Sequence, residues 1–203
     1  MRLLFREADK MANLSIEKAK SILKKHVTED HLFLHAQSVS AAMGAMAEYF
    51  NEDKEHWEAV GYLHDVDYEK YPEEHCHHVR DLLKDEGLDE ADIRAIISHG
   101  YGICSEECKP ITNLEKSLFT VDELSGIIMA SALMRPSGIE DMEVKSLKKK
   151  FKDKSFAAKC NREIIKSGFE MLGLDSDIVM QCCINGMRAY KNRLGIGKKS
   201  NLQ

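Results

Sequence analysis

The chain has 203 residues, 43% of them hydrophobic and 31% charged, which is ordinary for a globular protein with one sizeable core. Its formal net charge of −5 argues against stable nucleic-acid binding as the main function. No apolar run approaches the roughly 20 residues needed to cross a bilayer, and six cysteines without a signal-peptide pattern favour reduced thiols. We therefore expect a cytoplasmic protein that does not enter the membrane.

Helical patterns dominate the N-terminal half of the chain. Residues 1–14 precede the first of them and are expected to be poorly ordered. Ser15 suits the N-cap of a helix over 15–25, and apolar residues recur at helical spacing over 29–50 and 54–64.

The remaining helices are bounded by caps and breaks. Pro72 suits a first helical turn, Gly87 a helix end, and Thr112 with Glu115 a capping box. In chain order we predict helices over 72–87, 89–99, 112–134 and 142–150, one marked by Ala157, Cys160 and Met171 that stops at Gly173, and a last one from Ser176. No stretch alternates as a strand, so we expect a single all-α domain over 1–203.

A histidine and an aspartate stand together at the end of the helix predicted over 54–64. The acidic group of His64-Asp65 is unfavourable there, because the helix dipole already makes a C-terminus negative. A bound divalent cation would remove this conflict. His99 also ends a predicted helix.

Two further polar residues occupy apolar helix faces. Asp122 shares its face with Leu118 and Met129, and His35 is placed in the same way on the helix over 29–50. A buried carboxylate needs a partner or a metal. Taken singly, each of these residues is as well explained as a hydrogen-bonded polar group in the core.

Taken together, the residues resemble the HD-domain superfamily of metal-dependent phosphohydrolases, whose pattern is H…HD…D on a helical bundle. The matching residues are His35, His64-Asp65 and Asp122, and the resemblance covers roughly residues 28–190. It implies a compact HD-type bundle with its core at about 28–135 and C-terminal helices at 140–193 packed on that core.

The resemblance also implies two more metal ligands between the dyad and the final aspartate. His75 and His99 match these positions in the subgroup with two metals. His78 lies three residues beyond His75, on the same face of a helix, so either could be the ligand or bind substrate; His75 is preferred. Family members carry Gly and Lys shortly after the dyad, and here only Lys70 could serve as that substrate-binding lysine.

The implied activity is hydrolysis of a phosphate ester of a small metabolite or nucleotide, with one or two divalent ions per chain. Mn, Fe, Ni, Co, Zn and Mg are not distinguished by the sequence. Asp65 would bridge two ions, and Asp67 and Glu69 are the first candidates for acid–base catalysis, with Glu73 and Glu123 also near the ligands. The oligomeric state stays open.

A basic stretch supplies candidate phosphate-binding residues. Residues 145–162 hold eight lysines and arginines opposed only by Asp153, and Lys145 and Lys148 are among them. A solvated helix face explains the stretch equally well. Arg135 is a sharper single candidate, because it follows the helix that carries Asp122.

Two other functions fit the same ligand set. A di-iron oxygenase could use the same six residues for O2 chemistry, and a non-catalytic sensor could use the metal to bind a nucleotide. Metal content, oxygen consumption and turnover on phosphate esters separate these alternatives.

Overall fold

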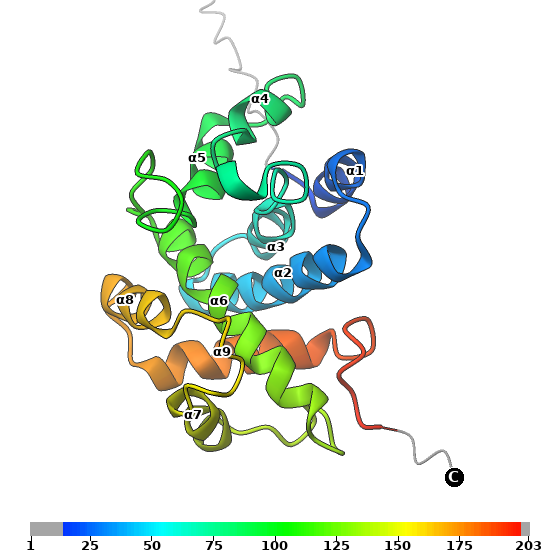
Figure 1. Ribbon diagram of the computed structural model, residues 1–203, viewed down its shortest axis with the longest axis vertical. Helices are drawn as coiled ribbons and strands as arrows, with labels where there is room; N and C mark the ends of the chain where they lie inside the picture. The colour runs from blue at the N-terminus through cyan, green and yellow to red at the C-terminus, as the bar shows by residue number, and fades with distance from the viewer. Residues whose placement is uncertain (1–13, 200–203) are drawn as a thin grey trace, which may run out of the picture.

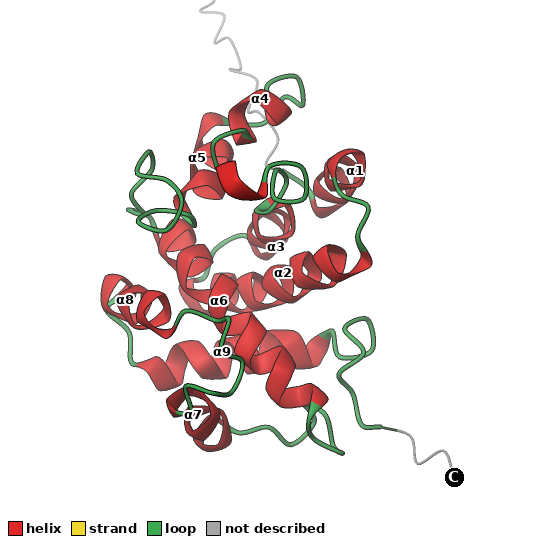
Figure 2. Cartoon of the chain, in the orientation of Figure 1, coloured by secondary structure: helices red, strands yellow, loops and turns green. Residues whose placement is uncertain are grey.

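The computed structural model describes residues 14–199, so the expectation for residues 1–14 lies almost wholly outside the described chain. Within that range the fold is all helical, as predicted, and the only bridge between extended residues is an isolated one joining Tyr101 and Ser105 (Figure 2). The elements in chain order are α1 (Ile16–His26), α2 (Asp30–Phe50), α3 (Lys54–Leu63), the 3-10 helix η1 (Pro72–Glu74), α4 (Val79–Leu83), α5 (Glu90–Ser98), α6 (Asn113–Leu133), α7 (Val144–Lys152), α8 (Arg162–Leu172) and α9 (Ser176–Ala189).

Two long helices, α2 and α6, organise the molecule. They contact each other, α3 and α9 pack on α2, and α5, α7 and α8 pack on α6 (Figure 1). The buried apolar residues form one cluster that runs from Leu14 to Ile196. The C-terminal helices therefore share a core with the helices that precede them.

Several helix starts are those that the sequence predicts. The side chains of Ser15, Asp53 and Asp89 each accept a backbone N–H of the first turn of the following helix. Thr112 and Glu115 form the predicted capping box at the start of α6. These bonds satisfy amide groups that have no partner inside the helix.

The helix predicted over 72–87 is broken, and this prediction was wrong. The chain forms only η1 and the short α4, with residues 75–78 between them. Cys76 has a φ of 68°, which a continuous α-helix does not allow. The backbone N–H of His78 instead donates to Asp67 at 3.2 Å, so a buried carboxylate replaces the helical partner.

The helix that leads to Gly173 begins later than its apolar pattern indicates. Ala157 has a φ of 45° and lies, with Cys160, in a turn-rich segment before α8. The side chain of Asn161 accepts the N–H groups of Glu163 and Ile164, so the helix starts at Arg162. A polar cap thus outweighs the apolar spacing.

In the described part of the chain, every helix is too short or too polar to cross a membrane.

A partly buried ion pair joins α3 to α5. Nε2 of His56 lies 2.6 Å from Oδ1 of Asp92, and this hydrogen bond outweighs burial and raises the pKa of His56. A raised folded-state pKa stabilises the fold fully below the unfolded pKa of about 6.5, and this stabilisation is lost as the pH rises through the folded-state value. We expect His56→Ala to lower the free energy of unfolding by urea more near pH 6 than near pH 9. An equal loss at both pH values would contradict this assignment.

Candidate metal centre

Six side chains from distant parts of the chain converge at one place. His35 comes from α2 and Asp122 from α6, while the other four lie where helices end or break. His64 and His99 are the C-cap residues of α3 and α5. Asp65 follows His64, and His75 follows η1. Helix ends leave these short side chains free to turn toward a common point.

Three of the six side chains form a first group around the Nε2 atom of His35. This atom lies 2.9 Å from Oδ1 of Asp122 and 3.2 Å from Nε2 of His64. The same Asp122 oxygen is 3.4 Å from Nε2 of His64. Three ligand-type atoms therefore face one another without an apolar side chain between them.

Asp65 joins this first group to a second one. Its Oδ2 lies 3.4 Å from His35 and 3.3 Å from His64, at their Nε2 atoms. Its Oδ1 lies 3.3 Å from Nε2 of His75 and 3.6 Å from Nε2 of His99. These last two nitrogens are 2.9 Å apart. The carboxylate of Asp65 thus directs Oδ2 to the imidazoles of His35 and His64, and Oδ1 to those of His75 and His99.

The imidazole rings are oriented by their other nitrogen. Nδ1 of His64 donates to the carbonyl of Gly61 at 2.9 Å, and Nδ1 of His99 donates to the carbonyl of Ile96 at 2.5 Å. Nδ1 of His75 donates to Oδ1 of Asp67 at 2.8 Å. Because these acceptors hold a proton on Nδ1, Nε2 is the nitrogen of each ring that faces the centre and that can bind a metal once it carries no proton.

The two carboxylates of the centre keep their charge. Burial alone would raise the pKa of Asp122, but its hydrogen bonds with His35 and His64 hold that pKa well below its usual range. Burial is likewise outweighed at Asp65, whose pKa is lowered by His64. Anionic oxygens and imidazole nitrogens within one cluster are the ligands that bind divalent transition metals.

A cavity of about 430 Å³ opens onto this cluster. Its walls include His35, Asp65, His75, His99 and Asp122, whereas His64 is fully buried behind them. The outer walls add Tyr68, Ile103, Glu123 and Lys159, of which the first two are 42% and 50% exposed. A small molecule that enters the cavity would therefore reach the ligand atoms directly.

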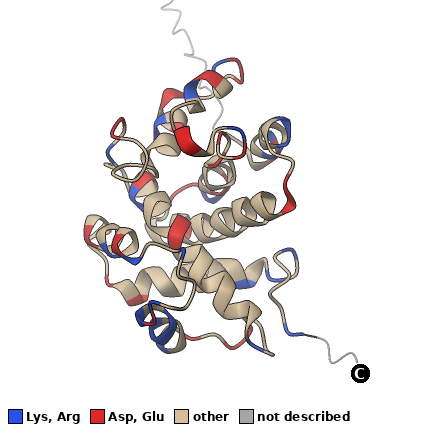
Figure 3. Cartoon of the chain, in the orientation of Figure 1, with Lys and Arg blue, Asp and Glu red and all other residues tan. Residues whose placement is uncertain are grey.

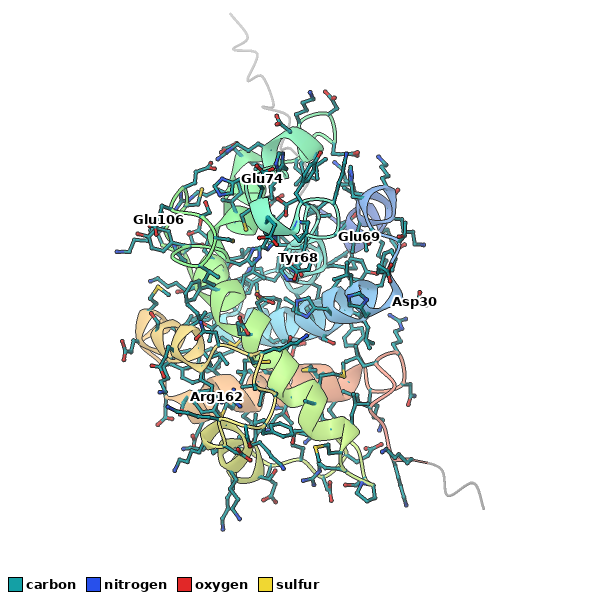
Figure 4. All side chains as sticks on the ribbon, in the orientation of Figure 1. Asp30, Tyr68, Glu69, Glu74, Glu106 and Arg162 are labelled. Atoms are coloured by element: carbon teal, nitrogen blue, oxygen red, sulfur yellow. The ribbon has the colours of Figure 1, made fainter. Side chains whose placement is uncertain are left out.

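The segment 153–161 brings Lys159 to the cavity. Arg162 holds this segment, because its guanidinium donates to the carbonyls of Phe151, Asp153, Phe156, Ala157 and Cys160. On the other side, Glu123 accepts the backbone N–H of Asn161 at 2.9 Å. Figure 4 labels Arg162 beside this segment. Hydrogen bonds from Arg162 and to Glu123 therefore hold the loop that carries Lys159 in place.

Asp67 and Glu69, the two candidates for acid–base catalysis, make structural hydrogen bonds. Asp67 is fully buried and uses its two oxygens for His75 and for the N–H of His78. Glu69 accepts the hydroxyl of Thr28 and the N–H groups of Thr28 and Glu29 at the start of α2 (Figure 4). Neither carboxylate lines the cavity. Asp67 orients the ring of His75, and Glu69 binds the two residues that precede α2.

His78 and Lys70 also lie outside the cavity lining. The ring of His78 stacks on Tyr71 with centroids 3.8 Å apart, and its Nε2 bonds to Glu74. The ammonium of Lys70 lies 5.1 Å from the centroid of the Tyr71 ring. Of the two histidines left open by the sequence, the structure brings His75 to the cluster.

We expect His75→Ala to lower the metal content of the purified protein and His78→Ala to leave it unchanged. His75 presents Nε2 to Asp65 and His99, whereas His78 is held by Glu74. Elemental analysis of both variants, expressed as metal per chain, tests the assignment. Loss of metal in His78→Ala alone would reverse it.

The basic residues expected to bind phosphate are dispersed. Arg135 pairs with Asp141 at 2.5 Å. Lys145 and Lys148 lie on α7 around a separate hollow, where Lys148 pairs with Asp177. Figure 3 shows the lysine-rich α7 at the end of the molecule opposite η1. Of the basic stretch, Lys159 is the lysine that the structure places in the cavity wall.

Tyr68 and Lys159 were not singled out from the sequence. Lys159 belonged to a run of lysines with nothing to distinguish it, and Tyr68 to the acidic stretch after the dyad. The sequence offered only their positions as a hint of a role in the site: Tyr68 lies three residues after Asp65, and Lys159 lies just before the cap of α8.

Comparison with protein-family models, curated proteins and solved structures found no match to this chain. The geometry itself establishes that several groups of side chains could hold a metal ion. Three such groups occur in the described chain, each with ligand atoms within 4.8 Å of one another: His35, His64 and Asp122; His64, Asp65 and His99; and His75, Cys76 and Cys104.

Proposed function

We propose that this protein is a metal-dependent phosphohydrolase of the HD type that cleaves a phosphate ester of a small metabolite or nucleotide. One observation carries the proposal: Asp65 directs one carboxylate oxygen to His35 and His64 and the other to His75 and His99. A carboxylate shared in this way can serve a pair of ions bound side by side.

The residues present fit two divalent ions. His35, His64 and Asp122 would hold one, His75 and His99 the other, and Asp65 would contact both. Imidazole and carboxylate ligands suit Mn, Fe, Co, Ni or Zn. Such ions, when bound, act as Lewis acids toward phosphoryl oxygens and lower the pKa of bound water.

The cavity walls favour an anionic substrate with an apolar portion. Among the described residues that line the cavity, Lys159 is the one lysine. Its ammonium group can bind a phosphate oxygen through a charge-assisted hydrogen bond. The exposed faces of Tyr68 and Ile103 offer an apolar surface to the leaving group. Glu123 and Arg162 keep the loop that carries Lys159 in place.

The direct test is a panel of phosphomonoesters, phosphodiesters and nucleotides assayed with each divalent ion in turn. We expect turnover of at least one ester, dependent on the added ion. Bound metal without turnover on the whole panel would indicate a nucleotide sensor. Two bound irons with oxygen consumption and no ester turnover would indicate an oxygenase.

Replacing Lys159 with alanine is expected to raise KM by roughly 10- to 100-fold, since a hydrogen bond to a charged group contributes about 1.5–3 kcal/mol. Metal content should not change, because Lys159 is not one of the six side chains of the cluster. Lys166→Ala on α8 removes the same charge at a position exposed outside the cavity and serves as the control. Equal KM values for both variants would exclude Lys159 from substrate binding.

A further inference from the structure

Two cysteines meet at the wall of the cavity, on segments that flank the ligands. Cys76 follows His75, and Cys104 lies in the loop after His99. An ideal Cβ on Gly100 would lie 2.5 Å from the sulfur of Cys76 and 2.6 Å from that of Cys104. Both thiols therefore fill the space that a side chain at Gly100 would need.

Hydrogen bonds to backbone carbonyls hold the two segments in place. Nε2 of His77 donates to the carbonyl of Cys104 at 2.8 Å. The N–H of Cys104 donates to the carbonyl of Gly100 at 3.0 Å, which closes the loop on itself. The sulfurs of Cys76 and Cys104 lie within 4.8 Å of each other. Little rearrangement separates them from the geometry of a disulfide.

The thiols are poorly suited to a metal site of their own. His75 is the third member of their group, but its Nδ1 is bonded to Asp67 and its Nε2 faces Asp65 and His99. Without that imidazole two sulfurs remain, which is fewer than the ligands of a closed metal site. Nε2 of His99 also lies 3.9 Å from the sulfur of Cys76, but that nitrogen faces Asp65 and His75. Two adjacent thiols whose neighbouring imidazoles face another cluster are arranged for thiol–disulfide chemistry.

Their exposure differs in a way that favours a defined order of reaction. Cys104 lines the cavity and is partly exposed, so a small oxidant can reach it. Cys76 is 1% exposed and lies behind it. An accessible thiol beside a buried one matches the division between a thiol that is oxidised first and a thiol that resolves the product.

We infer that Cys76 and Cys104 form a reversible disulfide when a peroxide enters the cavity. The sulfur of Cys104 attacks one peroxide oxygen, and the O–O bond breaks. Cys104 becomes a sulfenic acid, and one water is released. The sulfur of Cys76 then attacks the sulfur of Cys104, the S–O bond breaks, and a second water leaves. Two thiols lose two electrons in total, and the peroxide gains them.

The disulfide would regulate the metal centre, a consequence that rests on the proposed function. A bond of about 2.05 Å draws the segments after His75 and His99 toward each other. These two imidazoles share one oxygen of Asp65, so their shift disturbs that half of the centre. Disturbed support of a ligand typically lowers activity by about 10- to 100-fold.

The test begins with the purified wild-type protein and hydrogen peroxide, followed by peptide mapping without reduction. We expect a peptide pair cross-linked through Cys76 and Cys104, two hydrogen atoms lighter than the sum of its parts, which dithiothreitol separates. In Cys76→Ser the sulfenic acid on Cys104 should accumulate and react with dimedone. Cys160→Ser, which changes a thiol on another wall of the cavity, should still form the cross-link.

The inference would be overturned if the wild-type protein formed no such cross-link, or if other pairs of its cysteines cross-linked in the same yield as Cys76 and Cys104. Loss of metal from the reduced Cys104→Ser protein would also overturn it. The last would identify the thiols as ligands. Mapping does not depend on turnover, so a protein that cross-links but hydrolyses no ester would refute only the proposed function. Active protein without the cross-link would refute only the disulfide.

Discussion

Replacing Asp65 with alanine is expected to abolish turnover and to remove metal, while the helical circular dichroism spectrum persists. The side chain contacts both groups of imidazoles, so its loss deprives each of its shared oxygen. Bound metals contribute several kcal/mol to stabilisation of the reacting charge, so we expect a fall in kcat/KM on the order of 10³-fold or more.

Asp81→Ala is the matched control for this variant. Asp81 is an exposed carboxylate on α4, outside the cavity lining, so its removal changes net charge by the same amount and leaves the centre intact. Metal content and turnover should equal those of the wild type. Full turnover in Asp65→Ala would show that the chemistry takes place elsewhere in the molecule.

Chelation is expected to lower the thermal unfolding midpoint of the wild-type protein. Metal bound only to the folded state stabilises it by mass action, by roughly 3 kcal/mol per ion at a free concentration one hundred times the Kd. For a chain of this size that corresponds to a shift of roughly 5–10 °C.

The measurement is a pair of calorimetric scans of metal-loaded and EDTA-treated protein, with metal content determined for both samples. Re-addition of the ion that the protein retains on purification should restore the higher midpoint. Asp122→Ala, which lacks an oxygen of the first group, should show a smaller shift. Identical midpoints for samples with proven full and absent metal would show that the cluster is not a metal site.

Much of the helical framework could be predicted from the sequence because the relevant forces are local. The caps at Ser15 and Asp89 and the capping box of Thr112 act within four residues, and apolar spacing reports the buried face of the same helix. Four residues of the cluster, in three separate helical segments, were grouped because their types suit one cation and follow a known order. That grouping rested on the resemblance to the HD-domain pattern, because no local force links residues so far apart in the chain.

What the tertiary structure decided concerns the orientation of side chains at helix ends and in loops. The break at Cys76 turns His75 toward Asp65, and it depends on Asp67, a residue whose burial comes from helices packed around it. Lys159 reaches the cavity because Arg162 and Glu123 bind its loop from α8 and α6. Such contacts join residues that are far apart in the chain, and their energies depend on packing, so no local pattern in the sequence could reveal them.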